Sequence, residues 1–188
     1  MAAQASAGWS DEVECNGDTV LVANVDDFAH WFGQAVDSGG LEAIHHYGPA
    51  NACYLWRVAP GMVTISVDST RERLCLAQIE YADSEADRAA ARAYALAFDG
   101  LQQASGLHYR VDKGPVVAVC ATNSVQDTST SIARLPLSGA SPGGLIDFAG
   151  GPNAAALWLV PGLYASSLFF HEEDRWGVSW CRLQRLSD

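Results

Sequence analysis

Two segments about 100 residues apart follow the same order of residues, and this repeat constrains the fold more than any other feature. Residues 48–62 run from Gly-Pro through small residues to Leu-Trp, then to Pro-Gly and an apolar residue. Residues 151–163 follow the same course. Gly17–Val22 has a shorter counterpart in Gly114–Val119. The repeat indicates two related half-domains, 9–81 and 107–188; chance similarity between two short Trp and Pro-Gly hairpins is the alternative.

The spacing of apolar residues predicts an α+β fold, with a mainly antiparallel sheet and two principal helices. Val25, Phe28 and Phe32 recur at helical spacing after Asn24, a good N-cap, which predicts a helix over 25–37. The alanine-rich segment 85–105 predicts the second helix, which would link the two halves. We expect both helices to pack on one face of the sheet. Strands are expected at 19–23, 54–58, 62–67, 74–81, 107–111, 116–120, 163–170 and 176–183, and most of 121–150 is expected to be loop.

Length and charge predict one acidic domain over residues 9–188, after a flexible tail at 1–8. The formal net charge is −11, from 22 acidic and 11 basic residues. Such a surface repels nucleic acids and anionic membranes and attracts a basic protein partner, although solubility alone would also account for it. The sequence has neither a signal-peptide pattern at its start nor an apolar run of membrane-spanning length, so we expect a cytoplasmic protein.

The cysteines and histidines predict neither a metal site nor a cofactor. The five cysteines form no C-x-x-C pair, and an odd number argues against a disulfide framework. Cys53, Cys75, Cys120 and Cys181 lie in apolar runs, where cysteine is usually a small buried hydrophobe. Gly139–Gly143 has the letters G-x-S-x-G, but Pro142 lacks the N–H that an oxyanion hole would use. We therefore expect no catalytic residues and no enzyme activity.

Candidate contacts with a partner are residues that the pattern places at the surface. Two acidic residues lie in the first turn of the helix over 25–37, and Trp31 lies off its apolar stripe. Three more occupy the expected turn of the closing hairpin, close to a tryptophan. Solvated turns and core packing of the tryptophans are the alternatives. The candidates are Asp26, Asp27, Trp31, Glu172, Glu173, Asp174 and Trp176.

Several short motifs follow one another along the chain: Trp9, Gly17, Val20-Leu21-Val22, Trp31-Phe32-Gly33, Ala82–Ala86, Gly114-Pro115-Val116-Val117, Pro161-Gly162-Leu163-Tyr164 and Trp176-Gly177-Val178. Their order resembles the immunity protein 21 family of bacterial polymorphic toxin systems. The turn after Trp9 lacks the Gly-Gly-Pro of that family, and residues 51–54 also depart from its pattern. The resemblance implies a non-catalytic protein that binds and neutralises a cognate bacterial toxin by occlusion.

Two other functions stay open at this point. Six tryptophans on strand-rich segments also fit a carbohydrate or small-ligand binding module, with Trp176 as the stacking residue. The third possibility is an enzyme whose site is assembled from dispersed residues such as His45, His46 and Glu80. A deep pocket that gathers those groups would favour the enzyme.

Overall fold

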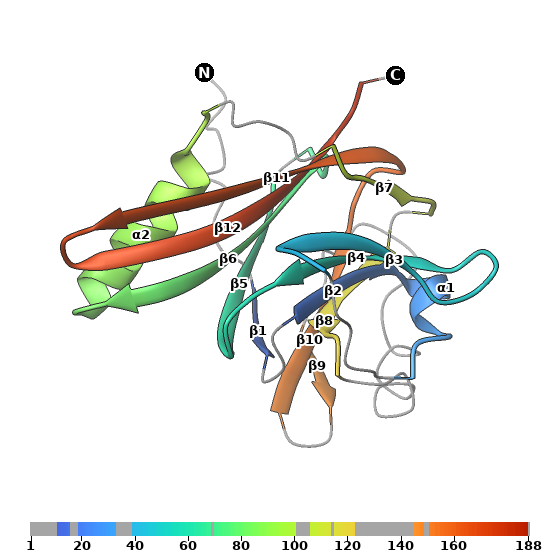
Figure 1. Cartoon of the computed structure of the whole chain (residues 1–188), viewed down its shortest axis with the longest axis horizontal. Coiled ribbons are helices and arrows are strands. Elements are labelled where there is room, and N and C mark those ends of the chain that lie inside the picture. The colour runs from blue at the N-terminus through green and yellow to red at the C-terminus, as the bar shows by residue number, and fades with distance from the viewer. Residues whose placement is uncertain are drawn as a thin grey trace.

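Over the residues that it describes, the computed structural model has two antiparallel sheets and two helices, which agrees with the predicted α+β class (Figure 1). Each sheet has six strands in this part of the chain. Trp9, the tail at 1–8 and Gly139–Gly143 lie outside the described residues. The structure describes residues 11–15, 19–32, 39–68, 70–100, 106–113, 115–122, 145–148 and 151–187.

Sheet A has the strand order β1-β5-β6-β12-β11-β7. Helix α2 (Glu85–Ala97) lies against β6 and β12 on the outer face of this sheet, where its Ala91 and Ala95 are buried. Ser84 caps the helix by accepting a hydrogen bond from the Asp87 N–H. The strands of sheet A are β1 (Asp11–Cys15), β5 (Gly61–Val67), β6 (Arg73–Ala82), β7 (His108–Val111), β11 (Gly162–Glu173) and β12 (Trp176–Arg185).

Sheet B has the order β3-β4-β2-β8-β10-β9. Its outer face carries a second apolar cluster, which includes Val25 and Phe28 of the short helix α1 (Val25–Phe28). The strands of sheet B are β2 (Thr19–Asn24), β3 (Glu42–His46), β4 (Ala52–Arg57), β8 (Pro115–Cys120), β9 (Leu145–Phe148) and β10 (Gly151–Trp158).

The strand order repeats itself. Each of the strands β1–β6 has a counterpart whose number is higher by six, for example β5 and β11. In both sheets, the two strands of such a pair lie at mirrored positions on either side of a central pair. The central pair is β6 and β12 in sheet A, and β2 and β8 in sheet B. This is the order that two related halves, 9–81 and 107–188, would give.

The Pro-Gly motifs are crossings between the sheets, and not the hairpins that the chance-similarity alternative named. β4 lies in sheet B and β5 in sheet A, and β10 and β11 are divided in the same way. Each crossing ends at a glycine with positive φ, Gly61 at 151° and Gly162 at 154°. Side chains other than glycine rarely adopt that backbone conformation. The motif therefore repeats because both crossings need it.

The main core fills the space between the two sheets. Tyr54 and Trp56 of β4 enter it from sheet B, and Tyr164 and Leu183 enter it from sheet A. All five cysteines are buried thiols, as predicted for the four in apolar runs. Burial raises the pKa of Cys53 and of Cys75 to about 12. At neutral pH these thiols therefore act as packing groups.

The first predicted helix is much shorter than expected. α1 ends at Phe28 after a single turn, and residues 33–38 lie outside the described part. Because the helix stops, helical spacing no longer governs the residues that follow, so Phe32 is exposed and Trp31 is buried. The two helices also cover different sheets, which contradicts the expected common face. Helix α2 ends at Ala97, and residues 98–100 are not helical.

The closing hairpin is confirmed, with a shift of its turn. β11 pairs with β12 from Tyr164–Arg185 to Glu173–Trp176, so the turn residues are Asp174 and Arg175. Glu172 and Glu173 belong to the end of β11. The strand β9 lies within the stretch expected to be mostly loop. No helix in the described ranges is long and apolar enough to span a membrane.

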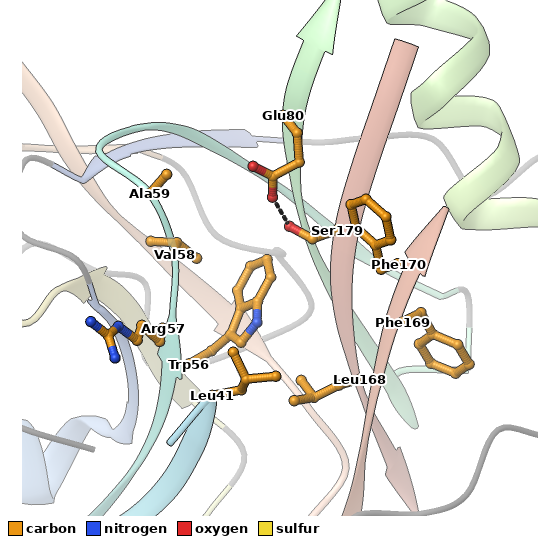
Figure 2. Close-up of a pocket in the computed structure, with 10 residues that line it drawn as sticks. All are labelled: Leu41, Trp56, Arg57, Val58, Ala59, Glu80, Leu168, Phe169, Phe170 and Ser179. Carbon is orange, nitrogen blue, oxygen red and sulfur yellow. Dashed lines mark hydrogen bonds between the residues drawn. The ribbon is translucent and has the colours of Figure 1, made fainter. Parts of the chain in front are cut away.

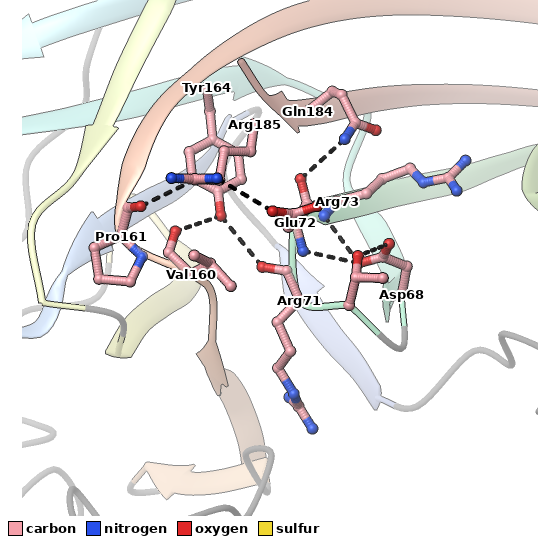
Figure 3. A network of polar contacts seen from close by, with 10 residues as sticks. Asp68, Arg71, Glu72, Arg73, Val160, Pro161, Tyr164, Gln184 and Arg185 are labelled. Atoms are coloured by element: carbon pink, nitrogen blue, oxygen red, sulfur yellow. Dashed lines mark hydrogen bonds and ion pairs between the residues drawn. The ribbon is translucent and has the colours of Figure 1, made fainter. Parts of the chain in front are cut away.

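A polar network holds the other end of the hairpin (Figure 3). The Tyr164 hydroxyl lies 2.6 Å from the Val160 carbonyl oxygen and 3.2 Å from that of Arg71. Arg185 donates to the Pro161 carbonyl oxygen and forms an ion pair with Glu72 at 3.2 Å. These contacts tie the β5–β6 turn to the crossing before β11. The network is therefore structural.

Candidate binding groove

A groove opens where the inner face of sheet A continues past the edge of sheet B. In Figure 1, β6, β11 and β12 extend beyond sheet B towards the tip of the closing hairpin. The groove has a volume of about 710 Å³. Figure 2 shows Trp56 at its centre, with Leu41 and Leu168 beside the ring and Ser179 and Phe170 further along. Two sheets and three distant chain segments thus form one concavity.

Two large apolar side chains at this groove are open to water. Leu41 is 67% exposed and Phe170 is 57% exposed, whereas Trp56 is only 4% exposed. The Leu41 carbonyl oxygen accepts a hydrogen bond from the Arg57 N–H at 2.8 Å, which fixes the chain before β3 against β4. Exposed apolar residues beside a concave, mostly apolar surface are typical of interaction sites.

Carboxylates continue from the groove to the hairpin tip. Glu80 lines the groove and accepts a hydrogen bond from the Ser179 hydroxyl. Glu172 lies two residues beyond Phe170, and therefore on the same face of β11. Partial desolvation raises the pKa of Tyr81, and the nearby carboxylates of Glu172 and Asp174 raise it further. The tip is therefore a region of negative potential around an exposed tyrosine.

A buried polar cluster fixes the two sheets to each other near the groove. The Tyr54 hydroxyl donates to Glu42 Oε2 at 2.5 Å and lies 2.9 Å from Ser166 Oγ. Ser166 also donates to Glu42 Oε2. Burial holds the pKa of Tyr54 well above its ordinary value. Since Ser166 is buried between the sheets, this cluster is a structural clamp between β3, β4 and β11.

The predicted acidic contacts lie at two separate ends of the molecule. Glu172, Glu173 and Asp174 are exposed at the hairpin tip, next to the groove. Asp26 and Asp27 belong to α1, which Figure 1 places at the opposite end. The structure therefore does not bring the two acidic groups together.

The acidic residues of α1 line a second pocket, of about 440 Å³. Asp26 forms an ion pair with Lys113 at 2.5 Å, and both side chains are mostly exposed. Asp27 accepts a hydrogen bond from the Asn24 amide at 3.1 Å. Burial raises the pKa of Asp27, and that hydrogen bond partly opposes the rise. Both acidic side chains of this pocket therefore already contact residues of the same chain.

The two predicted tryptophan contacts differ in exposure. Trp31 is 1% exposed and donates from Nε1 to the Ala121 carbonyl oxygen at 3.0 Å, so it is a core residue and not a partner contact. Trp176 is half-buried, with ring centroids 5.4 Å from His171 and 5.7 Å from Tyr94. Those neighbouring rings occupy part of its surface.

The residues of the dispersed enzyme site are not assembled. The ring of His45 packs near Trp31 and Tyr47 on the outer side of sheet B, whereas Glu80 lines the groove on the inner side of sheet A. Within the described ranges, no cluster of three or more His, Cys, Asp or Glu side chains could hold a metal ion. This geometry gives the enzyme hypothesis no support.

Sequence reasoning missed Leu41 and Phe170. Leu41 follows two glycines and resembles any residue at the start of a strand. Phe170 carried a usable signal, because Leu168, Phe170 and Glu172 alternate along one strand and the apolar face becomes acidic at its end.

No family model, curated protein or solved structure matches the chain.

Proposed function

We propose that this chain is a non-catalytic immunity protein that binds a cognate bacterial toxin and neutralises it by occlusion. The observation that carries the proposal is the groove, in which Leu41 and Phe170 are exposed beside the buried Trp56. A side chain of the partner inserted there would bury apolar surface of both proteins, at about 25 cal/mol per Å². The toxin as partner rests on the resemblance to the immunity protein 21 family.

The charge distribution supports a basic partner. The net charge is −11, and Glu80, Glu172 and Asp174 lie at or near the groove. Negative potential around an apolar contact site speeds association with a positively charged surface and selects against acidic proteins. Toxins that act on nucleic acids carry such basic surfaces, because their substrate is a polyanion. We place the complex in the cytoplasm, where thiols such as the five buried here stay reduced.

Co-expression with the product of the neighbouring gene tests this proposal. Wild-type chain should co-purify with that protein and restore growth to cells that express it. The double variant Leu41→Asp/Phe170→Asp should lose both properties, while Leu186→Asp, at an exposed apolar residue at the end of β12, should keep them. If the wild-type chain forms no complex and restores no growth, the proposal fails.

The carbohydrate alternative gains less support from the structure. A sugar needs an open aromatic face, and Trp176 shares its surface with Tyr94 and His171. The groove itself is rimmed by Leu41 and Phe170 and has Trp56 buried at its base. Such a surface suits an apolar side chain of a protein better than a polar sugar ring.

We also infer that the chain arose by duplication of a half-domain. The mirrored strand order and the matching glycines at 61 and 162 support this inference. The helices do not follow the repeat, since α2 comes after β6 and the described residues contain no counterpart of it after β12. Helix α2 packs on strands of both halves, because it contacts β6 of the first half and β12 of the second half.

A further inference from the structure

One side of the strand β11 is unpaired next to the groove. β12 pairs with β11 along nearly its whole length, whereas β7 pairs only with Gly162–Ala165 on the other side. Among the described residues, no strand pairs with β11 on the β7 side from Ser167 to Glu173. An exposed strand edge of this kind can template pairing with another chain.

The backbone groups that face this open edge can be identified from two hydrogen bonds. Ser166 N donates to the Leu107 oxygen at 3.1 Å, towards the β7 side. Leu186 N, just after β12, donates to the Leu163 oxygen at 2.8 Å on the opposite side. Since successive residues of an antiparallel strand alternate between their two neighbours, even-numbered residues of β11 face the open edge. Leu168, Phe170 and Glu172 therefore direct their N–H and C=O groups to this edge, where no strand of the described ranges pairs with them.

The same three residues direct their side chains towards the groove. Ser166 contacts Tyr54 across the intersheet space, and Leu168 packs against the intersheet core, so even-numbered side chains lie on the inner face. Phe170 and Leu168 line the groove, and Glu172 follows on that face. Edge hydrogen bonds and groove contacts are thus available to one and the same ligand.

We propose that β11 binds an extended segment of the partner protein, which adds to sheet A as an antiparallel strand along Leu168–Glu173. This inference rests on the proposed function and specifies how the partner protein is bound. Main-chain hydrogen bonds would give affinity, and the groove would select the alternate side chains. The antiparallel direction follows the other pairs of sheet A.

The groove defines the composition of this segment. Its residues opposite Leu168 and Phe170 share the inner face with them and lie next to Leu41, so they should be apolar and preferably β-branched. The residue opposite Glu172 should be lysine or arginine, because opposite charges on facing strands attract. The acidic tip beyond Glu172 disfavours an acidic segment.

The test uses the full-length chain and the synthetic peptide Lys-Thr-Val-Thr-Val-Thr-Lys, capped at both ends. In an added antiparallel strand, both valines face the groove and their N–H groups face β11. One control peptide is N-methylated on both valines, and the other is N-methylated on two threonines, whose N–H groups face solvent. Backbone amide exchange of Leu168, Phe170 and Glu172 is followed by NMR with and without each peptide.

The parent peptide and the threonine-methylated peptide should slow exchange at these three amides at least tenfold, and the valine-methylated peptide should not. Binding of the parent peptide without that protection would overturn strand addition. Equal binding of the valine-methylated peptide, or no binding of the parent peptide at millimolar concentration, would also overturn it. None of these outcomes affects the co-expression test, which decides separately whether the chain neutralises a toxin.

Discussion

Gly61 and Gly162 hold equivalent places in the two crossings between the sheets. Each is the first residue of the strand that leaves a crossing from sheet B to sheet A, and their φ angles are 151° and 154°. Room for a neighbouring side chain does not explain both glycines. An ideal Cβ on Gly162 would lie 2.6 Å from Arg185 Nε, whereas one on Gly61 would meet only Gln78 Nε2, at 3.4 Å. What the two share is the backbone conformation.

Gly162→Ala should lower the free energy of unfolding by about 1–3 kcal/mol, because alanine is strained at this φ. Displacement of Arg185, which also pairs with Glu72, should add to the loss. Urea denaturation measures the change. Gly40→Ala is the matched control, since a Cβ there meets nothing within 4 Å. Equal stabilities of the two variants would show that the crossing does not need glycine.

Ser84→Ala should destabilise the protein by about 1 kcal/mol, the usual effect of losing an N-cap. The Ser84 hydroxyl accepts from the Asp87 N–H at 3.2 Å and donates to Asp87 Oδ2 at 2.5 Å. Arg175 of the hairpin turn also donates to Asp87, so the cap connects α2 to the tip. Thermal unfolding checks this prediction against the exposed control Ser187→Ala. A loss no larger than that of the control would contradict it.

Asp27→Asn should stabilise the protein at pH 7. Burial raises the pKa of the folded Asp27 carboxyl above its ordinary value of 3.8, so ionisation is less favourable in the folded state. The wild type consequently loses stability as the pH rises from 3.8 through the folded pKa, and the neutral amide removes that loss. Melting temperatures at pH 7 and pH 4 should show an advantage of the variant at pH 7 that shrinks at pH 4. A variant less stable than wild type at pH 7 would refute this.

Reversing charge at the hairpin tip should slow association with the toxin. We expect Glu172→Lys/Asp174→Lys to lower kon about tenfold at low salt, because the tip no longer attracts a basic surface. Stopped-flow measurements at low and high salt separate this effect from a structural one, since screening should remove most of the difference. The same reversal at Asp26, at the other end of the molecule, should leave kon nearly unchanged. If the charge reversal at the tip left kon unchanged, Glu172 and Asp174 would not attract the toxin electrostatically.

The sequence predicted the local elements better than their assembly. Apolar runs located most strands, and Ser84 with the alanine-rich segment located α2. Trp31 was misplaced because α1 stops after one turn, and nothing local marks that stop. The strands around the Pro-Gly motifs were located, but their division between two sheets was not, because two short strands around a turn look alike whether they pair or separate into different sheets.

The groove could not be predicted in the same way. Phe170 is far along the chain from Leu41 and Trp56, and it lines the same groove only because sheet A extends past sheet B. β7 pairs with β11 only over Gly162–Ala165, so among the described residues the β7 side of β11 has no pairing strand beyond Ser166. The acidic tip was the one part of this surface that local sequence revealed.

The dissociation constant of the complex with the neighbouring gene product tests the central claim most directly. We expect Leu41→Ala/Phe170→Ala to weaken binding at least tenfold without changing the melting temperature by more than a few degrees, because both side chains are exposed. Leu186→Ala should bind like wild type. An unchanged dissociation constant for the double variant would show that the partner does not use the groove.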